Sequence, residues 1–312
     1  MQKFKHISVM LHECIDALNI KKDGTYLDGT LGGGGHSGEI LGKGGNLIAF
    51  DLDTVAIAHC FDKFSKDENF ANKFTLIHNN FKNCKHVLQN DIKGFNGLDG
   101  AILDLGISSY QIDTAERGFS YMQDAPLDMR LDGTHGRITA YNIVNESSEE
   151  EIRDILYKWG EEKNAKKIAA RIVQKREVEP IKTTGQLSTL VHNCFPPFIK
   201  GGHPAKRTFQ ALRIAVNEEL TDLGKAIEDI VSMLKKGARI AIISFHSLED
   251  RIVKQTLKKL AENCVCDKSI PICVCRNTAK IKLLNKGIKA SENELEQNSR
   301  AKSATLRIAE KL

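Results

Sequence analysis

Residues 28–38 read DGTLGGGGHSG and stand between two apolar segments, residues 25–28 (TYLD) and 46–51 (NLIAFD). This order predicts a strand, a glycine-rich loop, a short helix and a second strand. Glycines let the backbone approach a ligand closely, and the helix that follows presents free N–H groups at its N-terminus. Asp51 ends the second strand, where a carboxylate can accept hydrogen bonds from ribose hydroxyls. The stretch therefore predicts the cofactor-binding half of an α/β fold.

The alternation of apolar and helical segments continues along the chain. Near-continuous apolar strands that alternate with helices indicate a parallel sheet covered on both faces, a doubly wound α/β architecture. The further strands are expected at residues 74–78, 100–106, 238–245 and 304–309, and the helices at residues 54–64, 81–89, 215–234 (with a stop signal at 235–237) and 248–261.

A helical insertion is expected to interrupt this fold. Residues 110–215 contain no comparable strand pattern, but residues 148–157 and 162–175 have apolar residues at helical spacing, and Thr183 is a candidate cap of another helix. We therefore predict a discontinuous domain, residues 1–109 and 216–312, around an insertion at 110–215. Residues 163–215 hold eleven lysines and arginines against two glutamates. That excess suits an RNA-binding face, although a solvated lysine-rich surface would look the same.

The loop alone does not choose between two cofactors. Gly33, Gly35 and Gly38 match the dinucleotide fingerprint, which keeps an NAD-dependent oxidoreductase open. Asp28 and Asp104 end the first and fourth strands. Carboxylates there would repel a pyrophosphate but suit the cationic groups of S-adenosylmethionine (SAM). SAM is the favoured ligand, and a flexible turn with incidental acids is the alternative.

Longer strings carry a family resemblance. They are residues 104–113 (DLGISSYQID), 116–120 (ERGFS), 126–130 (PLDMR), 203–213 (HPAKRTFQALR) and 243–251 (ISFHSLEDR). From about His6 to Lys311 the chain resembles the RsmH (MraW) family of bacterial 16S rRNA cytosine-N4 methyltransferases. The resemblance implies a Rossmann-like class I SAM-dependent fold. It also implies methylation of the N4 amino group of a decoding-centre cytidine, position 1402 in the usual rRNA numbering, with the small ribosomal subunit as partner. A non-catalytic RNA-binding protein on the same fold is the remaining alternative.

The resemblance implies a set of SAM contacts and one catalytic residue. Asp51 would bind the ribose, Phe81 the adenine ring, and Asp104 would lie beside the methyl donor as the catalytic residue. The cofactor-binding set is Gly34, Gly35, His36, Asp51, Phe81, Asp104 and Gln111. From pattern alone, Phe81 could belong to the core, His36 could simply begin a helix, and Gln111 could be an ordinary loop residue.

The motif after the fourth strand differs from that of many amino-methyltransferases, which bears on the choice of a general base. Many of them carry Asn/Asp-Pro-Pro-Tyr/Phe after the fourth strand, whereas residues 104–107 here read DLGI. No general base is assigned. Transfer from a sulfonium needs an aligned nucleophile more than a strong base, so positioning is expected to carry most of the catalysis.

Substrate contacts are expected in two further motifs. Lys206, Arg207 and Arg213 are candidate phosphate contacts, and Phe209 among them is a candidate for stacking on an unpaired base. The alternative is a buried Phe209 with solvated cations. His246 and Ser247 follow the fifth strand and are candidates for lining the cytosine pocket. A turn histidine with satisfied hydrogen bonds is the alternative there.

Eight cysteines fall into two groups. Cys264, Cys266, Cys273 and Cys275 form two Cys-x-Cys pairs that are candidate ligands of a structural zinc ion. The alternative is reduced or redox-sensitive thiols on a hairpin. The scattered cysteines are expected to be reduced and buried, as in a cytoplasmic protein: Cys14, Cys60, Cys84 and Cys194.

The overall composition also fits a cytoplasmic protein. Hydrophobic residues make up 41% of the chain and charged residues 27%, as in globular proteins generally. No apolar run approaches the roughly 18–20 residues of a membrane span, and the N-terminus lacks the apolar core of a signal peptide. We expect a cytoplasmic protein with no membrane partner.

Overall fold

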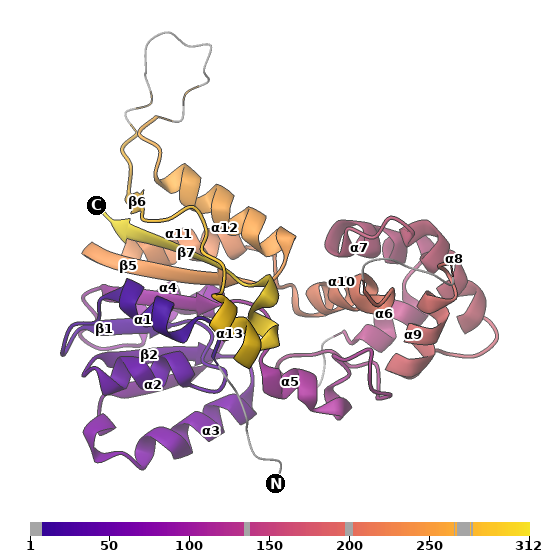
Figure 1. Ribbon diagram of the computed structural model, residues 1–312, viewed down its shortest axis with the longest axis horizontal. Coiled ribbons are helices and arrows are strands. Elements are labelled where there is room, and N and C mark those ends of the chain that lie inside the picture. The colour runs from indigo at the N-terminus through magenta and orange to yellow at the C-terminus, as the bar shows by residue number, and fades with distance from the viewer. Residues whose placement is uncertain (1–7, 134–137, 197–201, 265, 267–274, 276) are drawn as a thin grey trace. The chain divides into compact units, whose positions relative to one another are not determined.

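A computed structural model describes residues 8–133, 138–196, 202–264, 266, 275 and 277–312. The described residues form two compact units (Figure 1). The first unit comprises those of Met1–Gly106 and Asp222–Leu312, and the second those of Ile107–Thr221. No helix among the residues described is long and apolar enough to cross a membrane.

A seven-stranded sheet forms the centre of the first unit. Its order is β3-β2-β1-β4-β5-β7-β6, in which the first five strands are parallel and β7 and β6 are antiparallel to their neighbours. The carboxyl ends of β1, β2 and β4 therefore lie along one edge. The strands are β1 (Thr25–Asp28), β2 (Asn46–Asp51), β3 (Phe74–His78), β4 (Leu98–Asp104), β5 (Leu234–Ser244), β6 (Ile281–Leu283) and β7 (Thr305–Lys311).

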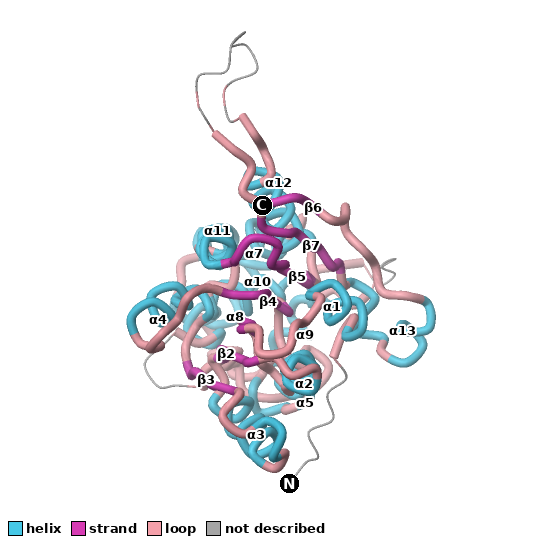
Figure 2. Tube along the Cα trace, turned by 90° about the vertical axis from the view of Figure 1, so that its left-hand side faces the viewer, coloured by secondary structure: helices cyan, strands magenta, loops and turns pink. Residues whose placement is uncertain are grey.

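Helices cover both faces of this sheet. Figure 2 shows α4 and α11 on one side of the strands and α1 and α2 on the other. Tyr26, Phe50, Phe64 and Leu103 are fully buried between these layers. The doubly wound α/β prediction is therefore confirmed. The helices are α1 (Leu11–Leu18), α2 (Gly35–Gly42), α3 (Thr54–Ser65), α4 (Cys84–Asn90), α11 (Leu223–Met233), α12 (Ser247–Leu260) and α13 (Glu292–Gln297).

The helix predicted over residues 215–234 was wrong. Two helices occupy this region, because α10 (Ala205–Asn217) ends where Glu218 adopts a left-handed φ of 49°, and α11 begins after Asp222 at 57°. The expected stop signal, residues 235–237, lies inside β5. Left-handed non-glycine residues leave no mark in an apolar pattern, which is why the break was missed.

The second unit packs its own helical core. Ile152 and Leu156 of α7 meet Phe209 and Leu212 of α10 in one buried cluster. Thr183 caps α9 as predicted, in a reciprocal capping box with Gln186. The helices are α5 (Ser109–Asp113), α6 (Ala140–Glu146), α7 (Glu149–Gly160), α8 (Ala165–Arg176), α9 (Thr184–His192) and α10.

A bidentate ion pair ties α12 to β7 in the first unit. Arg307 donates from Nε and Nη2 to Asp250 Oδ1 and Oδ2 at 2.7 and 2.9 Å. The Arg307 guanidinium lowers the pKa of the Asp250 carboxyl. The pair's contribution is therefore complete above the ordinary aspartate pKa and is lost as the pH falls through the lower folded-state value.

We predict that Asp250→Ala lowers the free energy of unfolding by about 1–2 kcal/mol, because a partly buried, charge-assisted pair is broken. Urea denaturation at neutral pH measures the loss. Asp62→Ala removes an exposed partner of Lys66 and is the matched control, with an expected change within about 0.5 kcal/mol. Equal losses in the two variants would show that the Asp250–Arg307 pair does not stabilise the fold.

Candidate active site

The glycine-rich loop takes a conformation that side chains would obstruct. Gly32 and Gly34 have φ values of 49° and 66°, and Gly34 is the N-cap of α2. A Cβ atom on Gly34 would lie 2.6 Å from Cys60 Sγ. These two glycines are required by the backbone, and they bring the first turn of α2 to the carboxyl edge of the sheet.

Asp28 braces this loop from below. Its side chain is 1% exposed. Oδ1 accepts a hydrogen bond from Thr30 N at 3.0 Å, and Oδ2 accepts one from the Ser37 hydroxyl at 2.7 Å. Burial raises the pKa of this carboxyl. Asp28 was predicted to suit a cationic ligand, and here each of its oxygens also accepts a hydrogen bond from the loop itself.

Asp51 lies beside the loop at the end of β2. Its Oδ2 accepts from Gly32 N at 2.7 Å and its Oδ1 from Asp53 N at 2.8 Å. Burial raises the pKa of Asp51 to about 6, even though these two bonds act in the opposite direction. Each carboxylate oxygen has a further lone pair, so the side chain can still accept from a ligand's hydroxyl groups.

Asp104 ends β4 on the same edge and carries an unsatisfied oxygen. Its backbone N–H donates to Thr30 Oγ1 at 2.7 Å. Its Oδ1 is buried and has no hydrogen-bond partner among the described residues. Burial, and then the charges of Asp28, Glu249 and Glu294, raise the pKa of Asp104 well above its ordinary value. A buried acceptor among other acids favours a cationic ligand.

His36 is buried in the first turn of α2 and faces Asp104. Its Nε2 lies 3.2 Å from the carbonyl oxygen of Val9, which can only accept, so Nε2 carries a proton. Its Nδ1 lies 3.9 Å from Asp104 Oδ2. The backbone N–H of Met10, next in the chain, donates to Glu294 Oε1 at 2.6 Å. Sequence reasoning missed Val9, Met10 and Glu294.

Phe81 stands next to the start of the loop. It begins the short 3-10 helix η2 (Phe81–Asn83), and a Cβ atom on Gly29 would lie 3.1 Å from Phe81 Cβ. The ring is only half-buried. A partly exposed aromatic ring beside a ligand loop suits stacking on an adenine ring better than a role in the core.

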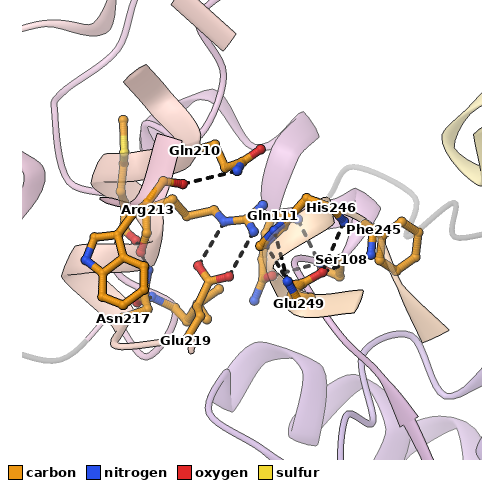
Figure 3. A network of polar contacts seen from close by, with 12 residues as sticks. Ser108, Gln111, Gln210, Arg213, Asn217, Glu219, Phe245, His246 and Glu249 are labelled. Carbon is orange, nitrogen blue, oxygen red and sulfur yellow. Dashed lines mark hydrogen bonds and ion pairs between the residues drawn. The ribbon is translucent and has the colours of Figure 1, made fainter. Parts of the chain in front are cut away.

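His246 and Glu249 cap α12 reciprocally (Figure 3). His246 is the N-cap, and its Nδ1 accepts from Glu249 N at 3.4 Å. Its Nε2 lies 3.0 Å from Glu249 Oε1. Glu249 Oε2 accepts from Phe245 N at 2.8 Å. His246 is therefore held at the start of α12, although its buried Nε2 makes no hydrogen bond among the described residues, and Ser247 is exposed in the first turn.

Residues predicted to bind the cofactor or substrate also lie in the second unit. Gln111 is buried and caps α5, with Oε1 accepting from Ser108 N at 2.9 Å (Figure 3). Lys206 and Arg207 are exposed on α10. Arg213 forms a bidentate pair with Glu219, with both N–O distances at 2.8 Å.

The expectation that Phe209 stacks on an RNA base was wrong. Phe209 is 3% exposed and belongs to the core of the second unit. It faces inward because α10 is amphipathic and places Phe209 on the same side as Leu212. The partly exposed rings near the start of α10 are Tyr121 and His203, which stack with centroids 4.7 Å apart.

The cysteines divide as the sequence predicted. The four scattered cysteines are buried and outside disulfides. Three of the four candidate zinc ligands lie together, because one ligand atom from each of Cys264, Cys266 and Cys275 falls within 4.8 Å of the others. Cys273 lies outside the described residues.

Comparison with known proteins assigns the family. The model of the MraW methylase family matches residues 3–312. The chain belongs to this family. It is 52% identical to the "Ribosomal RNA small subunit methyltransferase H" of Clostridium botulinum (strain Kyoto / Type A2) over 99% of this chain and 100% of that protein. It is 48% identical to the protein of the same name from Clostridioides difficile (strain 630), with the same coverage.

The MraW methylase family assignment agrees with the doubly wound α/β fold predicted from the sequence. A crystal structure of a putative rRNA methylase from Clostridium thermocellum aligns over 99% of this chain and 100% of that chain. Its sequence identity is 13% and its TM-score 0.44. That likeness is too distant to add to the family assignment.

We predict that Gly34→Ala lowers the free energy of unfolding by about 1–3 kcal/mol, because alanine is strained at a positive φ and its methyl group meets Cys60. Chemical denaturation measures the change. Gly38→Ala is the matched control in α2, since its Cβ would have no neighbour closer than 3.8 Å. We expect that control to be neutral or stabilising. A Gly34 variant as stable as the Gly38 variant would contradict the backbone requirement.

Proposed function

We propose that this chain is a SAM-dependent methyltransferase that modifies the N4 amino group of a decoding-centre cytidine in 16S rRNA of the small ribosomal subunit. The observation that carries the proposal is the unsatisfied Asp104 Oδ1, buried among acids at the edge that Asp51 and the glycine loop share. Full-length relatives named for small-subunit rRNA methylation support the substrate class. A ribosomal substrate also makes the cytoplasm the expected place of action.

The residues of the first unit fit SAM. Asp104 suits a positive charge, Asp51 can accept from ribose hydroxyls, and the half-buried Phe81 ring can cover the adenine. Gly34, Gly35 and His36 would border the ligand through the first turn of α2. When bound, SAM would supply a methyl group activated by a sulfonium. Gln111 is included as a SAM contact on the family resemblance alone.

An NAD-dependent oxidoreductase fits the same residues less well. Asp28, Asp51 and Asp104 all end strands at the edge where the cofactor would bind. A pyrophosphate would bring further negative charge to these carboxyls, of which Asp104 already has a raised pKa. Calorimetry with SAM and NAD in parallel separates the two readings, and NAD binding with no SAM binding would reject our proposal.

Asp104 is the proposed catalytic residue. Its Oδ1 can accept a hydrogen bond from the cytosine amino group and so orient the nitrogen lone pair toward the methyl group. Burial, and then the charges of the neighbouring acids, raise the pKa of that carboxyl, so it holds a proton more readily than an ordinary aspartate. His36 Nδ1, at 3.9 Å from Oδ2, limits the directions that the carboxyl can take.

The second unit is the proposed RNA-binding part. Lys206 and Arg207 are exposed cations that can contact phosphates, and Arg207 Nη1 is held by the Glu161 carbonyl at 2.9 Å. Tyr121 and His203 offer a partly exposed stacked pair for an unpaired base. Arg213 is neutralised by Glu219, so we assign it to positioning α10 within its unit. His246 and Ser247 remain proposed for the cytosine pocket.

Labelled methyl transfer tests the function. Purified protein is incubated with methyl-labelled SAM and with small subunits or naked 16S rRNA from cells that lack the protein. The rRNA is then mapped by nuclease digestion and mass spectrometry. We expect one label on the N4 of a decoding-centre cytidine. Label on another base, or RNA binding without any transfer in the presence of bound SAM, would contradict the proposal.

We predict that SAM affinity falls as the pH drops through about 6, because protonation of Asp51 removes a charged acceptor for ribose hydroxyls. Asp51→Asn should weaken binding roughly 10–100-fold at alkaline pH, the loss expected for about 1.5–3 kcal/mol. The SAM affinity of this variant should also depend less steeply on pH, because only the titration of Asp104 then remains. Titration calorimetry across this range is the measurement. Wild-type affinity and pH dependence in a folded Asp51→Asn variant would remove Asp51 from the site.

We predict that Lys206→Ala and Arg207→Ala each weaken RNA binding and reduce the salt dependence by about one unit of slope, with SAM affinity unchanged. A salt titration of RNA affinity measures this. Arg153→Ala is the control, because Arg153 is an exposed cation of α7 already paired with Asp154. If the control changes the slope as much as the two variants, the effect is one of net charge and α10 is not the contact.

A further inference from the structure

Three thiols converge between α12 and β6, apart from the residues proposed to bind SAM and RNA. Cys264 and Cys266 follow α12, and Cys275 precedes β6. The Sγ atoms of Cys264 and Cys275 are 3.9 Å apart, and that of Cys266 lies within 4.8 Å of both. A disulfide would need about 2.05 Å. Thiolates around a tetrahedral zinc ion, each about 2.3 Å from the metal, stand roughly 3.8 Å apart.

The two chain segments that carry these thiols are tied together at their base. Lys280 N donates to the Leu260 carbonyl at 2.8 Å, and Ala279 N donates to Asn263 Oδ1 at 3.1 Å. Asn277 Nδ2 donates to the Glu262 carbonyl at 2.6 Å. The described parts of both segments extend beyond the end of α12 in Figure 1. The thiols are therefore brought together by a backbone that is held in place on both sides.

A backbone donor also points at one of the sulfurs. Asn277 N lies 3.4 Å from Cys275 Sγ, two residues along the chain. An N–H group directed at a sulfur stabilises the thiolate, the form that binds metals, and such donors are regular partners of metal ligands.

We propose that Cys264, Cys266 and Cys275 bind one structural zinc ion as thiolates. Each thiol that becomes a ligand loses its proton to solvent as its Zn–S bond forms, so no oxidant or reductant is needed. Cys273, two positions before Cys275 in the sequence, lies outside the described residues and is not part of the proposed site. The metal would join the chain that leaves α12 to the chain that enters β6. Among the described residues, these two segments are otherwise linked by the hydrogen bonds at their base.

Metal content is the first test. The full-length chain, purified with reductant and without chelator, should contain about one zinc per chain by elemental analysis. Cys264→Ser and Cys275→Ser should each lower that content severalfold. Cys194→Ser is the control, because Cys194 is a buried thiol of the second unit, and it should leave the zinc content unchanged.

Cobalt substitution is the second test and reads the ligands directly. Protein loaded with Co²⁺ should show the intense thiolate charge-transfer and visible ligand-field bands of a tetrahedral site, and zinc should displace them. Both readouts are independent of methyl transfer, so the zinc proposal and the proposed function can fail separately.

Two results would overturn the proposal. One is zinc below about a tenth of an equivalent with all of these thiols titrating freely, together with no thiolate bands on adding Co²⁺. The other is a disulfide between Cys264 and Cys275, found by mass spectrometry in protein purified under reducing conditions. That outcome would assign the cluster to redox chemistry.

Discussion

The cost of burying Asp104 Oδ1 without a hydrogen-bond partner constrains the whole candidate site. Its carboxyl lies at the carboxyl edge of the sheet, with an unsatisfied Oδ1 and the charges of Asp28, Glu249 and Glu294 around it. A buried, unpaired acid destabilises a fold, and such strain persists where a ligand relieves it. Parallel pairing of β1 with β4 places this acid next to the glycine loop, and the Thr30 hydroxyl fixes the end of β4 by accepting from Asp104 N. The proposed cationic cofactor would relieve that cost.

Local sequence patterns sufficed for the elements on which the cofactor site is built. Strands 25–28, 46–51 and 74–78 were predicted to the residue, because each is a short apolar run ended by a polar residue or a turn. The glycine loop was recognisable because its backbone needs positive φ at Gly32 and Gly34. Asp51 and Asp104 follow from the topology, since parallel strands place their carboxyl ends at one edge.

The side-chain partners that tertiary packing selects could not be predicted in this way. Glu294 accepts from Met10 N across 284 positions, and no periodicity records such a bond. Phe209 looked like a base-stacking ring in a basic string, but the amphipathicity of α10 turns it into the core. Arg213 is neutralised by Glu219 six residues later, after the turn that ends α10. In each case the packing of the fold determined the partner or the burial of a side chain, which the residue type alone does not specify.

The central claim is that Asp104 is kept for a cationic ligand at the expense of stability. Asp104→Asn tests it most directly, through thermal unfolding of the free protein and SAM calorimetry on the same sample. Because the folded-state pKa of Asp104 is raised, its ionisation destabilises the fold as the pH rises, and a neutral amide removes that cost. We predict that the Asp104→Asn variant has an unchanged or higher Tm at neutral pH together with a SAM affinity lower by roughly tenfold or more. A lower Tm with wild-type SAM affinity would contradict it, because Asp104 would then serve the fold and not the ligand.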